Sequence, residues 1–96
     1  MNYTELITRL SLGESQNIEF KTSYRPDLVG RYVCAFLNSK GGYIICGVSN
    51  SEKILGLVPP IALSTVERNI NEGISPQALV TVEEHKLEGK QVLVLS

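Results

Sequence analysis

Apolar residues recur at helical spacing in three parts of the chain. The first predicts a short helix over residues 3–10 that ends before Gly13. A second helix is predicted to open at Pro26, because proline suits the first helical turn, and to end in the polar, glycine-containing stretch 38–42. The third is predicted to start at the capping box 64–67, Ser-Thr-Val-Glu, which precedes further apolar positions at helical spacing.

Other segments show strand patterns. Residues 17–21 alternate polar and apolar positions, as a half-buried strand does, whereas residues 43–48 form a continuous apolar run. A continuous run predicts an interior strand that is covered on both faces. The full set of predicted strands comprises residues 17–21, 43–48, 54–58, 79–84 and 91–95, with a turn around Glu88 and Gly89 joining the last two.

Together these elements predict an α+β fold with two layers, in which a mixed sheet of about five strands packs with three helices. Ninety-six residues are enough for one core and too few for two, so residues 1–96 are expected to form a single domain. The chain stops at Ser96, directly after an apolar strand, and we expect it to be the N-terminal part of a longer protein.

Composition narrows the class of protein. Apolar residues make up 43% of the chain and charged residues 20%, which are the proportions of an ordinary globular domain. No apolar run approaches the ~20 residues of a membrane span, so no membrane partner and a cytoplasmic location are expected. Cys34 and Cys46 lie in apolar surroundings and are expected to be free, buried thiols. They share no zinc-ligand spacing with the single histidine, His85.

Two glutamates are the first candidates for chemistry. Glu19 follows Glu14 by five positions, and with this odd spacing one continuous strand would direct the two side chains to opposite faces. If the chain bends near Gly13, the two carboxylates can converge, and they would then repel each other unless a proton or a cation neutralises them. Mg²⁺ suits such a site, because it binds through one or two carboxylates together with water and phosphate oxygens. The alternative is that Glu14 makes a local cap and Glu19 an ordinary ion pair.

Cations are the second group of candidates. The net charge of −1 does not favour nucleic-acid binding, but the segment from residue 21 to residue 51 is locally basic. The candidate phosphate contacts within it are Lys21, Arg25, Arg31 and Lys40. In a nuclease, Lys21 could also stabilise the negative charge that develops on a phosphate. The alternative is a plain, solvated basic surface.

Nucleotide hydrolysis by a phosphate-binding loop is excluded for this segment. The motif needs a lysine after its second glycine, whereas Lys40 precedes Gly41 and Gly42, and Gly47 is followed by valine. Any ATPase activity would have to lie outside these 96 residues.

Four motifs in order resemble the Schlafen AlbA-like DNA-binding domain. They are Glu-x-x-x-x-Glu-Phe-Lys-x-Ser (14–23), Val-Cys-Ala-Phe-Leu-Asn-Ser-x-Gly-Gly (33–42), Ile-x-Gly-Val-x-Asn (45–50) and Ile-x-Gly (54–56). The resemblance covers about residues 13–95. It implies the N-terminal module of a bacterial RecG-related ATP-dependent helicase or a transcriptional regulator, with ATP bound elsewhere in the full-length protein.

The resemblance also implies a catalytic alternative. Some animal Schlafen proteins are metal-dependent RNA nucleases, and their two catalytic glutamates match Glu14 and Glu19. Their third acid, an aspartate, matches Asn50, whose amide is neutral and cannot act as a base. The nearest acid, Glu52, could replace it only if its loop folds back. This departure favours binding a phosphate backbone over cleaving it.

Three functions therefore remain open. The first is a nucleic-acid-binding module that needs no cofactor; the family favours DNA as its partner, although the residues themselves do not separate DNA from RNA. The second is a nuclease that uses Mg²⁺ or Mn²⁺ with Glu14, Glu19 and Lys21. The third is a non-catalytic interaction domain that docks a partner or its own C-terminal region, and its signature would be an exposed apolar patch at residues 92–95.

Overall fold

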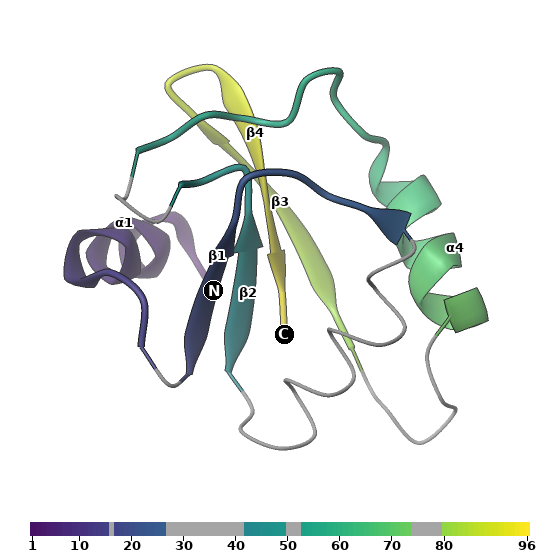
Figure 1. Cartoon of the computed structure of the whole chain (residues 1–96), viewed down its shortest axis with the longest axis horizontal. Coiled ribbons are helices and arrows are strands. Elements are labelled where there is room, and N and C mark those ends of the chain that lie inside the picture. Colours follow the sequence, from purple (N-terminus) through teal and green to yellow (C-terminus); the bar gives the residue numbers. More distant parts are fainter. Residues whose placement is uncertain (16, 27–41, 50–52, 74–79) are drawn as a thin grey trace.

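A mixed sheet organises the molecule. The computed structural model describes residues 1–15, 17–26, 42–49, 53–73 and 80–96. Within these residues the sheet has four strands: β1 (Ile18–Lys21), β2 (Tyr43–Cys46), β3 (Val82–Leu87) and β4 (Lys90–Leu95). Their order is β1-β2-β4-β3, with β1 parallel to β2 and the other pairs antiparallel (Figure 1). The α+β class and the mixed sheet are thus as predicted.

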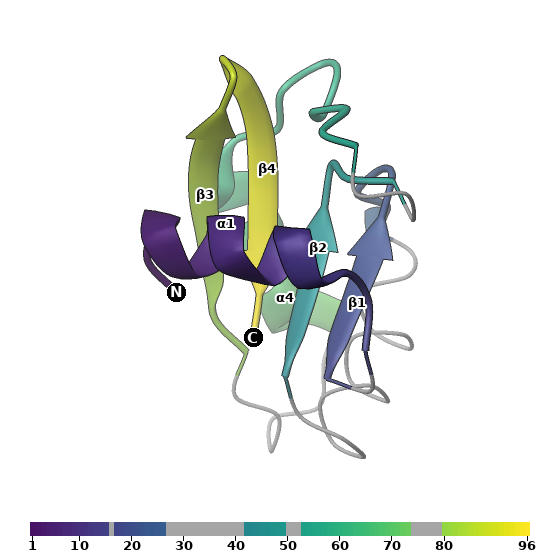
Figure 2. The same cartoon turned by 90° about the vertical axis from the view of Figure 1, so that its left-hand side faces the viewer.

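Two helices are described, and they cover opposite faces of the sheet (Figure 2). Leu6 and Leu10 of α1 (Tyr3–Leu12) are buried in one apolar cluster together with Phe20 of β1. Val66 and Ile70 of α4 (Leu63–Gly73) are buried in a second cluster on the other face. The predicted two-layer arrangement is therefore wrong, because the sheet lies between helices and is buried on both sides.

Helix α1 begins at Tyr3 and ends before Gly13 as predicted, but it extends two residues beyond the predicted range 3–10. The side chain of Asn2 accepts a hydrogen bond from the backbone N–H of Glu5 at 2.8 Å, which satisfies one of the free donors at the start of the helix. Gly13 ends the helix with a φ of 82°, and its N–H donates to the carbonyl of Arg9 at 3.2 Å.

Helix α4 begins at Leu63, so Ser64 lies inside the first turn and the predicted cap at this residue is wrong. The carbonyl of Ala62 accepts the first bonds of the helix instead. The helix predicted after Pro26 lies outside the described residues, as does Cys34.

The central strands β2 and β4 explain the two-sided core. The side chains of β2 alternate between the two clusters, with Ile44 and Cys46 on the α4 face and Ile45 on the α1 face. In β4, the four residues of the predicted docking patch, Val92–Leu95, are at most 1% exposed. The prediction of an exposed apolar surface on this strand is wrong, because β4 lies inside the sheet and its side chains are buried in the apolar clusters on both faces.

Residues 54–58 do not form the predicted fifth strand. Ile54 makes one isolated bridge to Val48, and the next two backbone N–H groups both donate to the carbonyl of Gly47, at 2.8 and 2.9 Å. In an antiparallel ladder each bonded residue exchanges hydrogen bonds with one opposite partner, whereas here two consecutive donors converge on one acceptor. The segment is instead an extended connection that crosses the end of the sheet.

The amide of Gln91 fixes the far end of this connection. Gln91 lies in β4 and is 3% exposed. Its Oε1 accepts from the backbone N–H of Ile61 at 2.8 Å, and its Nε2 donates to the carbonyl of Ile61 at 2.6 Å and to Glu84 at 2.9 Å. The backbone carbonyl of Gln91 also accepts from Leu57 at 3.0 Å. One polar residue thus holds residues 57 and 61 against the sheet.

Neither described helix is long and apolar enough to cross a membrane.

Candidate functional site

A tight turn brings the two glutamates together. Ser15 and Ile18 exchange two backbone hydrogen bonds, of 3.1 and 3.3 Å, so the chain reverses direction immediately before β1. Glu14 therefore runs back beside β1 instead of preceding it in a straight line. The bend that convergence requires is present, and it lies one residue beyond the Gly13–Glu14 position predicted for it.

The carboxylate of Glu14 caps the outer edge of β1. Its Oε2 accepts from the backbone N–H of Phe20 at 3.2 Å. This N–H has no partner within the sheet, because β1 is the edge strand of the described residues and pairs only with β2. The predicted local capping role of Glu14 is thus confirmed, and it coexists with the convergence on Glu19.

The two carboxyl groups interact directly. A hydrogen bond between the side chains of Glu14 and Glu19 raises the pKa of Glu14, and partial burial and the negative charge of Glu19 raise it further. The Phe20 N–H and the positive charge of Lys21 act in the opposite direction without cancelling the rise. Two carboxyls that share a site favour one proton or one cation between them. The raised pKa of Glu14 shows that this pair gains stability when it binds a proton.

Lys21 ends β1 on the same face as Glu19. The register pairs Glu19 with Ile44 and Lys21 with Cys46, and both partners belong to the cluster under α4. The carbonyl of Lys21 accepts from two backbone N–H groups, those of Gly47 at 2.8 Å and Val48 at 3.1 Å. These two hydrogen bonds, from the residues that follow β2, fix the backbone of Lys21.

Cys46 beside this lysine is not a reactive group. Burial raises the pKa of its thiol to about 12, and the nearby charge of Lys21 lowers it only in part. The thiol is therefore protonated at neutral pH, and it is neither a nucleophile nor a ready metal ligand. The prediction of a free, buried thiol at this position is confirmed.

The remaining predicted site residues are placed as follows. Arg25 is exposed and follows β1 by four residues. Arg31, Lys40, Asn50 and Glu52 lie outside the described residues. Ser49 and Lys53 flank the position of Asn50 and are joined by two hydrogen bonds, of 2.9 and 3.2 Å.

The described residues limit the type of metal site. No group of three or more His, Cys, Asp or Glu side chains suited to a metal occurs among them. The available protein ligands there are the carboxylates of Glu14 and Glu19. A hard cation held in this way would keep several coordination positions for water or for phosphate oxygens, which is the manner of Mg²⁺.

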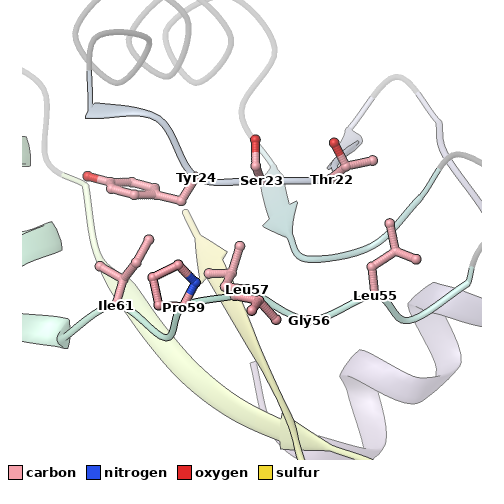
Figure 3. A pocket seen from close by; sticks show the side chains of 9 residues that line it. Thr22, Ser23, Tyr24, Leu55, Gly56, Leu57, Pro59 and Ile61 are labelled. Atoms are coloured by element: carbon pink, nitrogen blue, oxygen red, sulfur yellow. The ribbon is translucent and has the colours of Figure 1, made fainter.

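A pocket that the sequence did not predict adjoins this site. It has a volume of about 430 Å³ and lies between residues 22–24, which follow β1, and residues 55–61 (Figure 3). Its lining residues come from segments more than 30 positions apart, and neither segment has a regular period. The available signal in the sequence was the pair of prolines that directly follows Val58 in an apolar segment.

Among the described residues, the domain is a mixed sheet between helices, with Glu19 and Lys21 on the edge strand β1 and Glu14 beside it. The family model described as "Schlafen, AlbA_2" matches residues 14–96, and the chain belongs to this family. Membership suggests a nucleic-acid-related domain.

A solved structure has the same fold, namely that of the DIP2311 protein from Corynebacterium diphtheriae. The TM-score is 0.64 at 15% sequence identity, and the match covers 96% of this chain and 24% of that one. At this identity the likeness concerns the fold alone. The chain spans about a quarter of the length of that protein.

Proposed function

We propose that the domain binds the sugar–phosphate backbone of a nucleic acid at the end of β1, with DNA as the favoured partner. The observation that carries the proposal is the position of Lys21 and Arg25 on either side of the exposed hydroxyl residues Thr22 and Ser23. Cations and hydroxyls are the groups that contact phosphate oxygens without reading base sequence. Arg31 and Lys40 are further candidate contacts from the sequence.

The carboxylate pair restricts how this contact is made. Glu14 and Glu19 lie next to Lys21, and unneutralised carboxylates would repel a phosphate. A shared proton or a divalent cation removes this repulsion, and the cation would in addition attract the phosphate. In a longer protein, such as a RecG-related helicase or a transcriptional regulator, the domain would hold nucleic acid for other parts of the chain.

The test is a binding titration against salt. Labelled duplex DNA, single-stranded DNA and RNA are titrated with the protein by fluorescence anisotropy, with and without Mg²⁺. Phosphate contacts predict that log K falls linearly with log salt, with a slope of roughly −0.9 per contacted phosphate on duplex DNA. Replacing Lys21 and Arg25 together by glutamine should reduce the slope by roughly two contacts.

Lys86→Gln is the matched control. Lys86 is exposed on β3, at the opposite edge of the described sheet, and pairs loosely with Glu84 at 3.9 Å. Its replacement removes a charge of the same type and should leave the slope unchanged. Salt-independent binding, or equal losses in the double variant and the control, would refute the proposed contacts.

A metal-dependent nuclease is the second candidate, and the convergence of Glu14 and Glu19 favours it. With Mg²⁺ or Mn²⁺ bound by this pair, Lys21 would stabilise the charge on the scissile phosphate. The expected results are cleavage of RNA or DNA that requires metal, loss of cleavage in Glu19→Gln, and a gain in Asn50→Asp.

Glu72→Gln provides the control for this candidate, since Glu72 is exposed on α4 and distant in sequence from the pair. Calorimetric titration with Mn²⁺ separates the two candidates. Metal binding without cleavage supports the binding function alone, and cleavage that survives Glu19→Gln removes the pair as its source.

A further inference from the structure

The pocket beyond β1 is a half-open hollow that is lined mainly by apolar residues. Figure 3 shows residues 22–24 along one side and residues 55–61 along the other, with the side chains of Leu55 and Ile61 directed across the gap. The ring of Tyr24 closes one end, near Ile61. A volume of about 430 Å³ is within the range of sites for small organic ligands, roughly 300–1,000 Å³.

The walls of the pocket are held in position before any ligand arrives. The hydroxyl of Tyr24 accepts a hydrogen bond from Asn69 of α4 at 3.0 Å, which fixes the plane of the ring. Gln91 holds Ile61 through two bonds, and the carbonyl of Gly47 holds the backbone of residues 55 and 56. Preformed walls lower the entropic cost of binding.

Apolar surface is nevertheless left open to solvent at the rim. Val58 is 89% exposed and Leu55 is 40% exposed. No acidic side chain is among the lining residues that the structure describes. The site therefore favours an uncharged group with apolar surface over a cation.

The residues that border the pocket indicate which kind of ligand would occupy it. The wall formed by residues 22–24 lies directly between Lys21 and Arg25, the proposed phosphate contacts. The hydroxyls of Thr22 and Ser23 point away from the opposite wall, toward the outside of the pocket (Figure 3). An apolar slot with cations at its border matches a nucleotide, which joins a planar base to a phosphate.

We propose that this pocket receives one unstacked base of a single-stranded nucleic acid while Lys21 and Arg25 hold the adjoining phosphates. The inference rests on the proposed function and deepens it. A base in a duplex is stacked and paired, and extracting it costs a few kcal/mol. A base in a single strand does not have to be unpaired first, so the pocket should make the domain bind single strands more tightly than duplexes. The contact is tolerant of sequence, since every base has an apolar face.

The experiment compares three labelled ligands by anisotropy: oligodeoxythymidine, an abasic strand with the same number of phosphates, and the corresponding duplex. The strand with bases is expected to bind roughly tenfold more tightly than the abasic strand, as for one base stacked on a protein surface. Leu55→Ala with Val58→Ala should remove most of this difference and leave the affinity for the abasic strand unchanged.

Leu12→Ala is the matched control, because Leu12 is an apolar residue of α1 that is 73% exposed. It should leave all three affinities unchanged. The side chains replaced at the pocket rim are at least 40% exposed, and Leu12 is exposed as well. The rim variant and the control should therefore both have the melting temperature of the wild type.

The possible results distinguish the base pocket from the proposed phosphate contacts. Equal, salt-dependent binding of the base-containing and abasic strands would overturn the base pocket and leave the proposed function standing. A variant that weakens both strands equally would also overturn it, because the pocket would then not contact bases. If neither strand binds, the proposed function fails and the pocket proposal fails with it.

Discussion

Replacing Gln91 with methionine tests the contact that holds the pocket against the sheet. Methionine has nearly the same length but no amide, so the N–H and the carbonyl of Ile61 lose their partners inside a half-buried region. The change also removes the donor to Glu84, whose side chain is 36% exposed. The volume of the core stays almost constant, which isolates the effect of the hydrogen bonds.

The expected loss follows from the three bonds. Two neutral bonds contribute about 0.5–1.5 kcal/mol each, and leaving buried groups unpaired adds a penalty. The bond to Glu84 is charge-assisted, but its exposure places it at the low end of the usual 1.5–3 kcal/mol. Methionine buries more apolar surface than glutamine does, and this burial offsets part of the loss in stability. We therefore expect the free energy of unfolding to fall by about 2–4 kcal/mol.

Urea denaturation followed by circular dichroism measures this change. The midpoint should fall while the slope of free energy against urea stays constant, because the surface exposed on unfolding is nearly unchanged. Lys86→Met is the control. Lys86 is the exposed cross-strand neighbour of Gln91, and its replacement should shift the stability by at most about 0.5 kcal/mol. A loss below about 1 kcal/mol in the glutamine variant would refute the assignment of Gln91 as the anchor of residues 57–61.

Two further predictions concern β1 and its neighbours. Glu14→Gln should raise the stability at pH 7, because the raised pKa of Glu14 means that its proton stabilises the fold at acid pH and is lost as the pH rises. Glu14 is exposed and water screens the repulsion, so this gain should be at most about 1 kcal/mol. The gain should disappear below pH 4.5, the ordinary pKa of the group, and a gain that is constant with pH would contradict the carboxyl contact. Gly42→Ala should cost more than about 2 kcal/mol in urea denaturation, because its φ is 107° and a Cβ would lie 2.0 Å from the carbonyl oxygen of Asn17. Gly89→Ala is its control, because Gly89 has a φ of 74° and a Cβ there would meet nothing within 4 Å. Only the backbone cost of about 1–2 kcal/mol is expected for this variant. Equal losses in the two variants would exclude the contact with Asn17.

Regular periods in the sequence predicted the regular parts of the fold. The alternation in residues 17–21 and the continuous apolar run from Tyr43 predicted β1 and the interior strand β2, because burial on one face or on two leaves different patterns. The number of layers was not predictable in the same way. An apolar stripe shows that a helix covers a sheet, but not which face it covers.

Non-local contacts account for the other differences. The apolar residues of the segment 54–58 suggested a strand, yet the hydrogen bonds of this segment go to Gly47 and Gln91, which are distant in sequence. Gln91 looked like an ordinary polar residue at the start of a strand. Its burial depends on Ile61, 30 positions away, and no local pattern records that contact.

The sequence predicted what the carboxylate pair requires, but not whether the chain meets this requirement. The parity of Glu14 and Glu19 correctly required a bend, but the turn that makes it is closed by the backbone of Ser15 and Ile18. Backbone hydrogen bonds of this type are possible for almost any sequence. The sequence could therefore state the condition for convergence without deciding whether it is met.

The capped edge of β1 also bears on how copies of the domain behave toward one another. An uncovered edge strand offers its N–H and carbonyl groups to any passing strand, which is a route to aggregation. Here an incoming strand would have to displace Glu14 from the Phe20 N–H and bury two carboxylates. The two negative charges at this edge thus protect it from self-association. Acidification neutralises the same charges, so a tendency of the domain to associate should first emerge at low pH.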